Sequence, residues 1–190
     1  MKRIFVEEQN FVGKDYSSQR LARGDYEYCQ FEDCNFSQSD LSAIQFVECT
    51  FTNCDWSNAH LHELGLRDVS FVNCKLLGLQ FEHLNPYAFA AEFEDSQLDL
   101  SSFHQRSVKG MRFVNCQLRE VDFTEADLTG ASFDGCDLDR AIFERTKLEK
   151  ADFRTARNFL IDPEINQVRN ARFLQADLAR LLSKHQLHIE

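Results

Sequence analysis

The sequence has no apolar run near the ~20 residues that a membrane-spanning helix requires, which excludes an ordinary helical membrane protein. It also has only 2 Pro and 7 Gly among its 190 residues, whereas Phe occurs 18 times. The first stretch, MKRIFVEEQN, turns acidic before a hydrophobic signal region can form, so we expect no secretion signal. These absences predict a soluble, cytoplasmic protein of one domain.

Positive charge is scarce: 21 Lys and Arg face 31 Asp and Glu, for a net charge of −10. Because Lys and Arg bind phosphate backbones, we expect no direct binding of nucleic acid. The deficit is uneven, since residues 1–95 carry 7 basic and 16 acidic side chains and residues 96–190 carry 14 and 15. An acidic band without Lys or Arg remains at 120–139. This balance favours solubility or a basic partner.

Catalytic motifs are missing as well. There is no GxxxxGK phosphate loop and no GxSxG nucleophile elbow. His60 and His62 flank Leu61 and permit at most a two-histidine surface metal site. The 7 Cys are an odd number without a secretion signal, so a disulfide framework is not expected. We expect no enzymatic activity, no metal and no cofactor.

Large apolar residues recur every five positions, from Phe11 to Phe81 and then, two residues out of phase, from Phe93 to Phe153. This period fits neither a helix, which repeats at 3.6, nor a plain strand, which repeats at 2. It fits a short extended piece followed by a turn. The residue two before each central one points to the same side and is small or apolar, except Arg106.

All seven Cys occupy this small inward position, as Cys49 and Cys54 do in FVECTFTNCDW. A buried thiol there acts as a small hydrophobic group. Thiols aligned in parallel in one column also do not converge as a tetrahedral zinc site requires. The predicted structural core comprises Phe31, Phe51, Phe71, Phe93, Phe113, Phe123, Phe133, Phe143, Phe153, Phe173, Cys34, Cys54, Cys74, Cys116 and Cys136.

The segment ADLTGASFDGCDLDRAIFERTKLEKADFRT, residues 126–155, resembles the pentapeptide repeat family, whose consensus is A(D/N)Lxx. The resemblance implies an all-β fold: a right-handed quadrilateral β-helix, or pentapeptide repeat solenoid, with four pentapeptides per coil. The sequence supports a 20-residue coil independently, because Phe residues lie 20 apart from Phe11 to Phe71 and again from Phe93 to Phe173. One interior column is therefore predicted to be a nearly continuous Phe stack.

Two departures from the repeat divide the predicted single domain, residues 1–190, into parts. Asn85 and Pro86 indicate a turn at the phase slip, and LQADLARLLSKHQ has helical spacing of Leu. We expect an N-terminal cap (1–10), a first repeat block (11–81), an interrupting loop (82–92), a second repeat block (93–157), and an irregular last coil with a short C-terminal helix and cap (158–190).

The interruption and the ending IDPEIN plus helix look similar to the topoisomerase-protecting members of the family, which confer quinolone resistance, microcin B17 immunity or albicidin resistance. That resemblance implies a protein that resembles DNA in shape and charge and binds DNA gyrase or topoisomerase IV. A scaffold or protein-interaction module is the alternative, because repeats specify a fold more tightly than a function. A continuous acidic face would favour mimicry, and mixed faces would favour the scaffold.

The same resemblance implies surfaces for the partner and for a homodimer joined through the C-terminal end. At the loop, Tyr87 and Phe89 either protrude or fold back over the solenoid. The proposed partner-binding residues are Asn85, Pro86, Tyr87, Phe89, Glu120, Glu125, Asp134 and Asp139. The proposed dimer interface consists of Phe173, Leu174, Leu178, Leu181, Leu182, Leu187 and Ile189.

Overall fold

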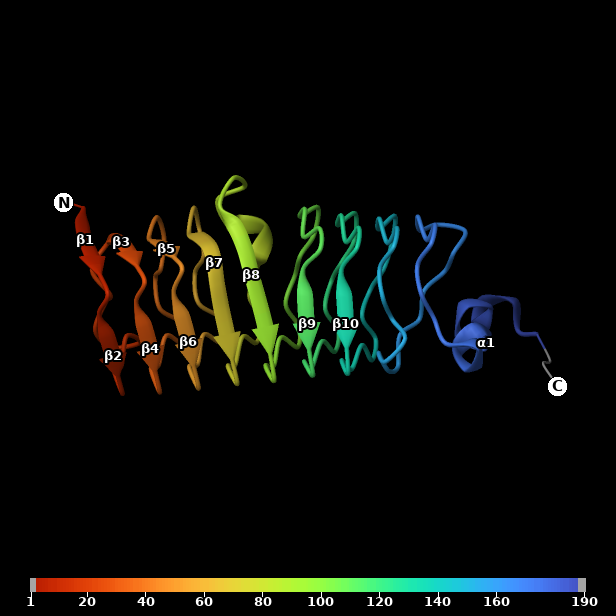
Figure 1. Ribbon diagram of the computed structural model, residues 1–190, viewed down its shortest axis with the longest axis horizontal. Helices are drawn as coiled ribbons and strands as arrows, with labels where there is room; N and C mark the ends of the chain where they lie inside the picture. The colour runs from red at the N-terminus through yellow and green to blue at the C-terminus, as the bar shows by residue number, and fades with distance from the viewer. Residues whose placement is uncertain (1–2, 188–190) are drawn as a thin grey trace.

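The computed structural model describes residues 3–187, which form one elongated solenoid with the two ends of the chain at opposite ends of the rod (Figure 1). Ten short strands belong to one sheet with parallel pairing. The strands are β1 (Ile4–Glu7), β2 (Asn10–Val12), β3 (Gly24–Glu27), β4 (Gln30–Glu32), β5 (Gln45–Val47), β6 (Thr50–Thr52), β7 (Gly65–Val72), β8 (Phe89–Glu94), β9 (Arg112–Val114) and β10 (Ser132–Asp134). The predicted fold class, a right-handed quadrilateral β-helix with a short C-terminal helix, is confirmed.

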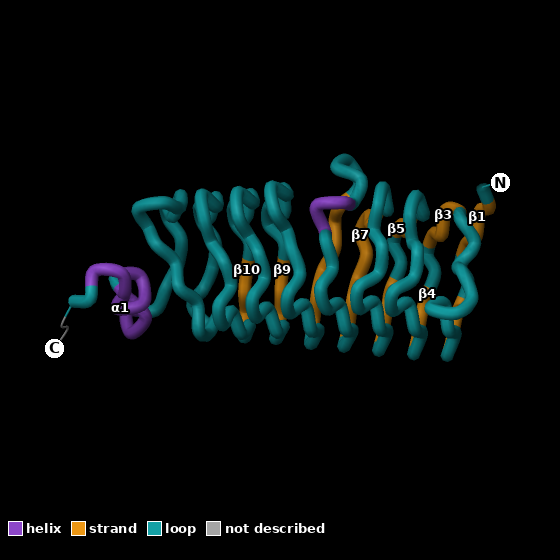
Figure 2. The backbone as a smooth tube through the Cα atoms, turned by 180° about the vertical axis from the view of Figure 1, so that it is seen from behind, coloured by secondary structure: helices purple, strands orange, loops and turns teal. Residues whose placement is uncertain are grey.

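Among residues 3–187, helical structure is confined to the interruption and the C-terminal segment (Figure 2). The 3-10 helices span Phe81–His83, Gln175–Asp177 and Ser183–His185, and the α-helix α1 spans Leu178–Leu181. The C-terminal helix is therefore one α-helical turn flanked by 3-10 turns, shorter than the Leu spacing suggests. Within residues 3–187, no helix has the length and hydrophobicity that a membrane-spanning helix requires.

Each coil has four faces, and each face directs one central side chain into the interior. Face 1 carries Val6, Tyr26, Phe46, Leu66, Phe89, Val108, Leu128, Leu148 and Val168; face 2 carries Phe11, Phe31, Phe51, Phe71, Phe93, Phe113, Phe133, Phe153 and Phe173; face 3 carries Tyr16, Phe36, Trp56, Leu76, Leu98, Leu118 and Leu138; face 4 carries Leu21, Leu41, Leu61, Phe81, Phe103, Phe123 and Phe143.

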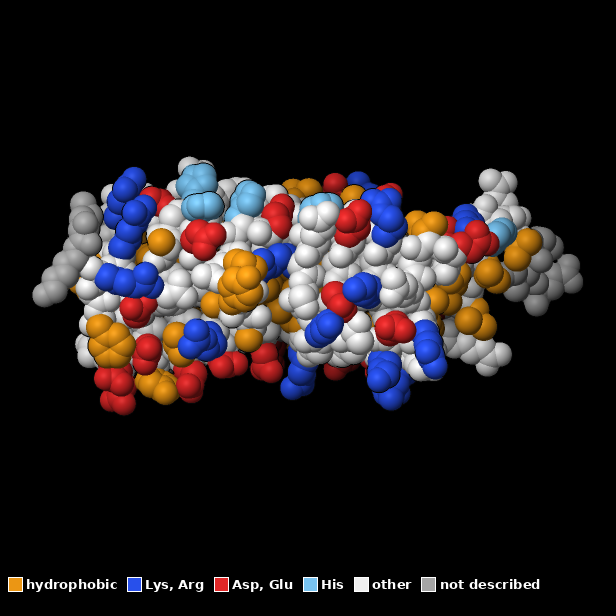
Figure 3. Space-filling model, turned by 90° about the horizontal axis from the view of Figure 1, so that it is seen from above, with side chains coloured by type: hydrophobic (Ala, Val, Ile, Leu, Met, Phe, Trp, Pro, Cys, Tyr) orange, Lys and Arg blue, Asp and Glu red, His pale blue; other side chains and the backbone are white. Residues whose placement is uncertain are grey.

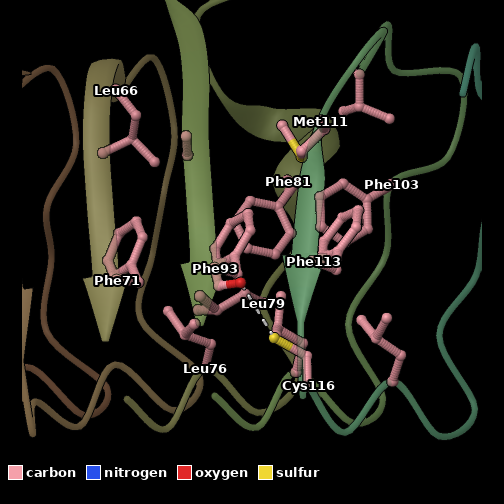
Figure 4. Close-up of a cluster of buried hydrophobic side chains, with 14 of the residues drawn as sticks. Leu66, Phe71, Leu76, Leu79, Phe81, Phe93, Phe103, Met111, Phe113 and Cys116 are labelled. Atoms are coloured by element: carbon pink, nitrogen blue, oxygen red, sulfur yellow. Dashed lines mark hydrogen bonds between the residues drawn. The ribbon is translucent and has the colours of Figure 1, made fainter. Parts of the chain in front are cut away.

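The rings of face 2 form a continuous stack. Neighbouring ring centroids are 4.6–5.4 Å apart and the ring planes differ by 5–14°. This spacing follows the ~4.8 Å distance between paired strands, because each coil adds one strand to the ladder. Rings of faces 2 and 4 also meet edge to face, as Phe103 and Phe113 do at 5.9 Å (Figure 4). Stacked and edge-to-face rings, together with the Leu and Val side chains of the other faces, form one buried hydrophobic core.

Most corners between faces share one backbone conformation. The residue two after the central one has a positive φ at these corners, for example 52° at Asp33, 55° at Asn53 and 52° at Asn73. At many of these corners the N–H donates to a carbonyl of the next coil, as Asp33 N does to Thr52 O at 3.0 Å. The ladder thus offsets the cost, about 1–2 kcal/mol per residue, of placing non-Gly residues in the left-handed region.

Counted from Phe11 on face 2, the fourth coil runs from Phe71 to Phe89, and the path departs from this geometry at the corners on either side of Phe89. Phe81 and Phe89 are eight residues apart instead of five, so the corner between faces 4 and 1 contains three extra residues. Phe89 and Phe93 are only four apart, so the next corner lacks one residue, and Asp68 of β7 bulges opposite the missing position. Together these changes give the net slip of two residues.

Two predicted boundaries are wrong. Residues 4–7 are not part of a separate N-terminal cap, because β1 pairs with β3 as the first strand of face 1. Residues 89–92 are not part of the loop, because β8 begins at Phe89 and pairs with β7. The protruding loop is therefore restricted to the segment between the 3-10 helix Phe81–His83 and β8, visible above the rod in Figure 1.

Candidate protein-interaction surface

The cysteines form part of the buried core. All seven are buried, and each thiol lies against backbone carbonyl groups; Cys116 Sγ donates to Phe93 O at 3.4 Å (Figure 4). Burial raises the pKa of Cys49 to about 12, so this thiol stays protonated at neutral pH. Within residues 3–187, no group of three or more His, Cys, Asp or Glu is arranged to hold a metal ion, and His60 and His62 lie exposed on face 4.

The other core residues predicted from the sequence are buried, apart from Phe173, which is half-buried at the C-terminal end of the Phe stack. Phe123, for example, stacks on Phe103 and Phe143 with centroids 5.3 and 5.2 Å away. None of these side chains is available to a ligand, so contacts with other molecules must use the outward residues, the loop or the ends.

The loop presents one aromatic side chain to solvent. Tyr87 is 95% exposed, and Pro86 beside it is exposed as well. Asn85 Oδ1 accepts a hydrogen bond from Tyr87 N at 3.0 Å, which fixes a tight turn at the loop tip. Phe89 instead folds back and stacks on Phe81 at 5.7 Å. The sequence left open whether these aromatic side chains protrude or fold back over the solenoid. In the structure Tyr87 protrudes, whereas Phe89 folds back and is half-buried.

Arg106 anchors this loop from inside the solenoid. It occupies an inward position and is only 9% exposed. Its Nη1 donates to Leu84 O and its Nη2 to Asn85 O, both at 3.2 Å, and its guanidinium lies 5.5 Å from the Phe89 ring centroid. Burial lowers the pKa of Arg106, and Glu82 nearby partly opposes that effect. The sequence signal for this role was the single charged residue at an inward position.

The acidic residues predicted to bind a partner are largely neutralised. Glu120 pairs with Arg140 at 2.7 Å, Asp139 lies 3.4 Å from the same guanidinium, and Glu125 pairs with Arg145 at 2.9 Å. Most of these partners are 20 residues apart, so adjacent coils place opposite charges side by side. Asp134 accepts a hydrogen bond from Thr155 Oγ1. The second half of the rod therefore does not present these four residues as an open acidic surface.

The acidic surplus lies on another edge, at the corner between faces 1 and 2 in the N-terminal half. We call Glu7, Glu8, Glu27, Glu48 and Asp68 the acidic corner. None of these residues forms an ion pair with another residue of the described range 3–187. Arg67 lies in the same corner, in register with Val47 and next to Asp68, so the corner has a surplus of four negative charges. Figure 3 shows acidic side chains along one long edge of this half.

The C-terminal end combines an anchored segment with exposed leucines. Lys184 Nζ lies 2.7 Å from Asp162 Oδ2 and 2.6 Å from Glu164 Oε2. These contacts raise the pKa of Lys184 and lower that of Asp162. Leu181 is half-buried against the core. Of the other residues predicted for the dimer interface, Ile189 lies outside the described residues, and four leucines are exposed: Leu174, Leu178, Leu182 and Leu187.

Comparison with known proteins places this geometry among repeat proteins. The family model for the pentapeptide repeat region matches residues 25–86 and 88–153. A solved structure of trypsin-treated QnrB1, described as a plasmid-mediated fluoroquinolone resistance protein, is 18% identical, with 98% of this chain and 92% of that chain covered and a TM-score of 0.51.

HetL from the cyanobacterium Nostoc sp., described as involved in heterocyst differentiation regulation, is also 18% identical, with coverage of 90% and 87% and a TM-score of 0.48. A pentapeptide repeat protein of the Arabidopsis thaliana thylakoid lumen is 19% identical, with coverage of 60% and 71% and a TM-score of 0.35. No curated protein matches the chain in sequence. At 18% identity, the likeness to the QnrB1 structure is one of fold.

Proposed function

Since this chain belongs to the pentapeptide repeat family, we propose that it acts without catalysis, as a stiff cytoplasmic rod that binds a type II topoisomerase, DNA gyrase or topoisomerase IV. In this proposal it modulates the enzyme or protects it from quinolones or peptide toxins. The acidic corner is the observation that carries the proposal, because five carboxylates without ion-pair partners among residues 3–187 lie along one edge of a regular rod.

Electrostatic complementarity explains how such an edge would act. A topoisomerase must hold DNA in a surface rich in Lys and Arg, and a stiff acidic edge attracts the same surface. Tyr87, exposed on the anchored loop, supplies an aromatic side chain of the kind that often contributes most to a protein interface. The similarity in fold to QnrB1, a fluoroquinolone resistance protein, is consistent with a type II topoisomerase as the partner.

The ion pairs of the second half restrict how far the rod can imitate DNA. Arg140 and Arg145 neutralise Glu120 and Glu125, so the proposed DNA-like character is limited to the N-terminal half. Mixed charges of this kind favour the second candidate function, a scaffold that binds a protein other than a topoisomerase through its faces.

A supercoiling assay separates the two functions. Purified DNA gyrase is assayed with and without a fluoroquinolone while this protein is titrated into the micromolar range. The proposal predicts inhibition of supercoiling or protection from the drug. If neither occurs with gyrase or with topoisomerase IV, the topoisomerase function is refuted and the scaffold function is retained.

Charge reversal locates the interaction. The triple variant Glu27→Lys, Glu48→Lys and Asp68→Lys should abolish the effect in the assay. A control triple variant, Glu63→Lys, Glu144→Lys and Glu149→Lys, changes the net charge equally but lies outside the acidic corner. Equal loss in both variants would show that net charge, and not the acidic corner, determines binding.

A further inference from the structure

The hydrogen-bonded ladder of face 1 is interrupted between the fourth and fifth coils. β8 pairs with β9 only at Phe93 and Glu94. Within residues 3–187, no backbone hydrogen bond joins Phe89–Glu92 to Ser107–Met111. One coil further on, the ladder is intact: Val108 N donates to Asp127 O and Gly110 N to Thr129 O, both at 2.9 Å. The Phe89–Glu92 part of β8 is therefore unpaired on the side that faces Ser107–Met111.

The missing corner residue explains the interruption. β8 passes from face 1 to face 2 with no residue in the left-handed conformation, whereas the fifth coil turns the same corner at Gly110 with φ 66°. The two backbones consequently cannot remain parallel across this corner. Arg106 adds to the separation, because its side chain bonds to Leu84 O and Asn85 O from the inward position of the fifth coil.

A groove of about 480 Å³ occupies this break, between β8 and Ser107–Arg112. Its apolar lining comes from Phe89, Ala91, Val108 and Met111. Glu92 and Arg112 lie on opposite sides of it at matching positions of their coils, and neither has an ion-pair partner among the described residues. Lys109, also in the lining, is paired with Asp127 at 3.3 Å. The groove thus combines an apolar floor with one carboxylate and one guanidinium.

We propose that this groove, here named the β8 groove, binds a short extended peptide segment of a partner protein, which adds a strand to the free edge of β8. Unpaired N–H and C=O groups of a strand edge pair readily with another extended chain. Phe89–Glu92 offers four residues, enough for a peptide of about 13 Å at ~3.3 Å per residue. Small apolar side chains of the peptide contact the floor.

The charges that line the β8 groove favour a peptide over a phosphate or nucleotide ligand. A phosphate or nucleotide is disfavoured, because Asp68 and Glu92 line the same groove as Arg112. A peptide with outward residues of both signs satisfies Glu92 and Arg112 together, and its backbone satisfies the strand edge. The inference is independent of the identity of the topoisomerase partner, because the groove and the acidic corner share only Asp68.

The test uses the full-length protein labelled with ¹⁵N and a panel of peptides of the form acetyl-X-Z-X-Z-X-amide, with Val or Ala at Z and Glu, Lys or Ser at X. Members with both Glu and Lys are expected to shift the amide signals of Ala90–Glu92 and Ser107–Gly110 at about 1 mM peptide, a weak affinity typical of a short strand. If no peptide of the panel shifts these signals, the proposal is overturned.

Two controls establish that strand pairing at this groove is responsible. The best-binding peptide is resynthesised with N-methylated backbone amides, which removes its hydrogen-bond donors and should abolish the shifts. Ala90→Trp, which fills the groove, should weaken binding at least tenfold, whereas Thr129→Trp at the equivalent position two coils further should not. Equal binding of the N-methylated peptide, or equal weakening by Thr129→Trp, would also overturn the proposal.

Discussion

Arg106→Met tests whether one inward guanidinium holds the loop in place. Met retains much of the side-chain volume but cannot donate hydrogen bonds. The substitution removes the donors to Leu84 O and Asn85 O and the contact with the Phe89 ring. The loop should then lose its fixed path across the fourth coil.

The expected loss of stability follows from these contacts. A hydrogen bond from a charged donor contributes about 1.5–3 kcal/mol, and the contact with the ring adds about 0.5–1 kcal/mol. Removing the guanidinium also removes the cost of burying a charge, which is reflected in the lowered pKa of Arg106 and offsets part of the loss. We expect the free energy of unfolding to fall by about 2–4 kcal/mol.

Urea unfolding at equilibrium measures this change, and cleavage by chymotrypsin after Tyr87 reports on the loop. Arg140→Met is the matched control, because Arg140 forms an exposed ion pair with Glu120 at 2.7 Å and should contribute at most about 1 kcal/mol. Arg106→Lys should be intermediate, because an ammonium lacks the planar fork that reaches both carbonyls. Stability within about 0.5 kcal/mol of wild type, with unchanged cleavage, would refute the anchoring role.

Three further predictions concern the core and the C-terminal end. Phe123→Asp should lower the melting temperature sharply and Phe123→Leu only modestly, because only the Asp variant buries an unpaired charge. Equal melting temperatures of the two variants, measured by circular dichroism, would contradict this prediction. The pKa of Asp162 in the folded protein lies below its usual value of 3.8, so the contact with Lys184 is present above pH 3.8 and is lost as the pH falls through the pKa of the folded protein. Amide hydrogen exchange in α1 should accelerate as the contact is lost, and Lys184→Ala should remove that pH dependence. Light scattering should give twice 22.1 kDa for the wild type and 22.1 kDa for Leu178→Asp with Leu182→Asp; a monomeric wild type would exclude the dimer.

The sequence alone determined the solenoid, its 20-residue coil and the Phe stack. A five-residue period leaves few ways to bury two side chains per repeat, so the pattern from Phe93 to Phe153 fixes both the column and the spacing of its rings. The position of the interruption could also be predicted from the sequence, because Pro86 lies where the five-residue repeat shifts by two residues.

Only the tertiary structure decided how the surface is arranged. Ion pairs such as Glu125 with Arg145 join residues of adjacent coils, so a charge count along the chain cannot reveal which carboxylates remain free. The net slip of two residues conceals three added at one corner and one missing at the next, which only the register of β7 and β8 resolves. The role of Arg106 and the β8 groove arise from that difference, because a periodic sequence specifies its repeating unit, whereas the contacts at an irregularity depend on how two neighbouring coils meet in space.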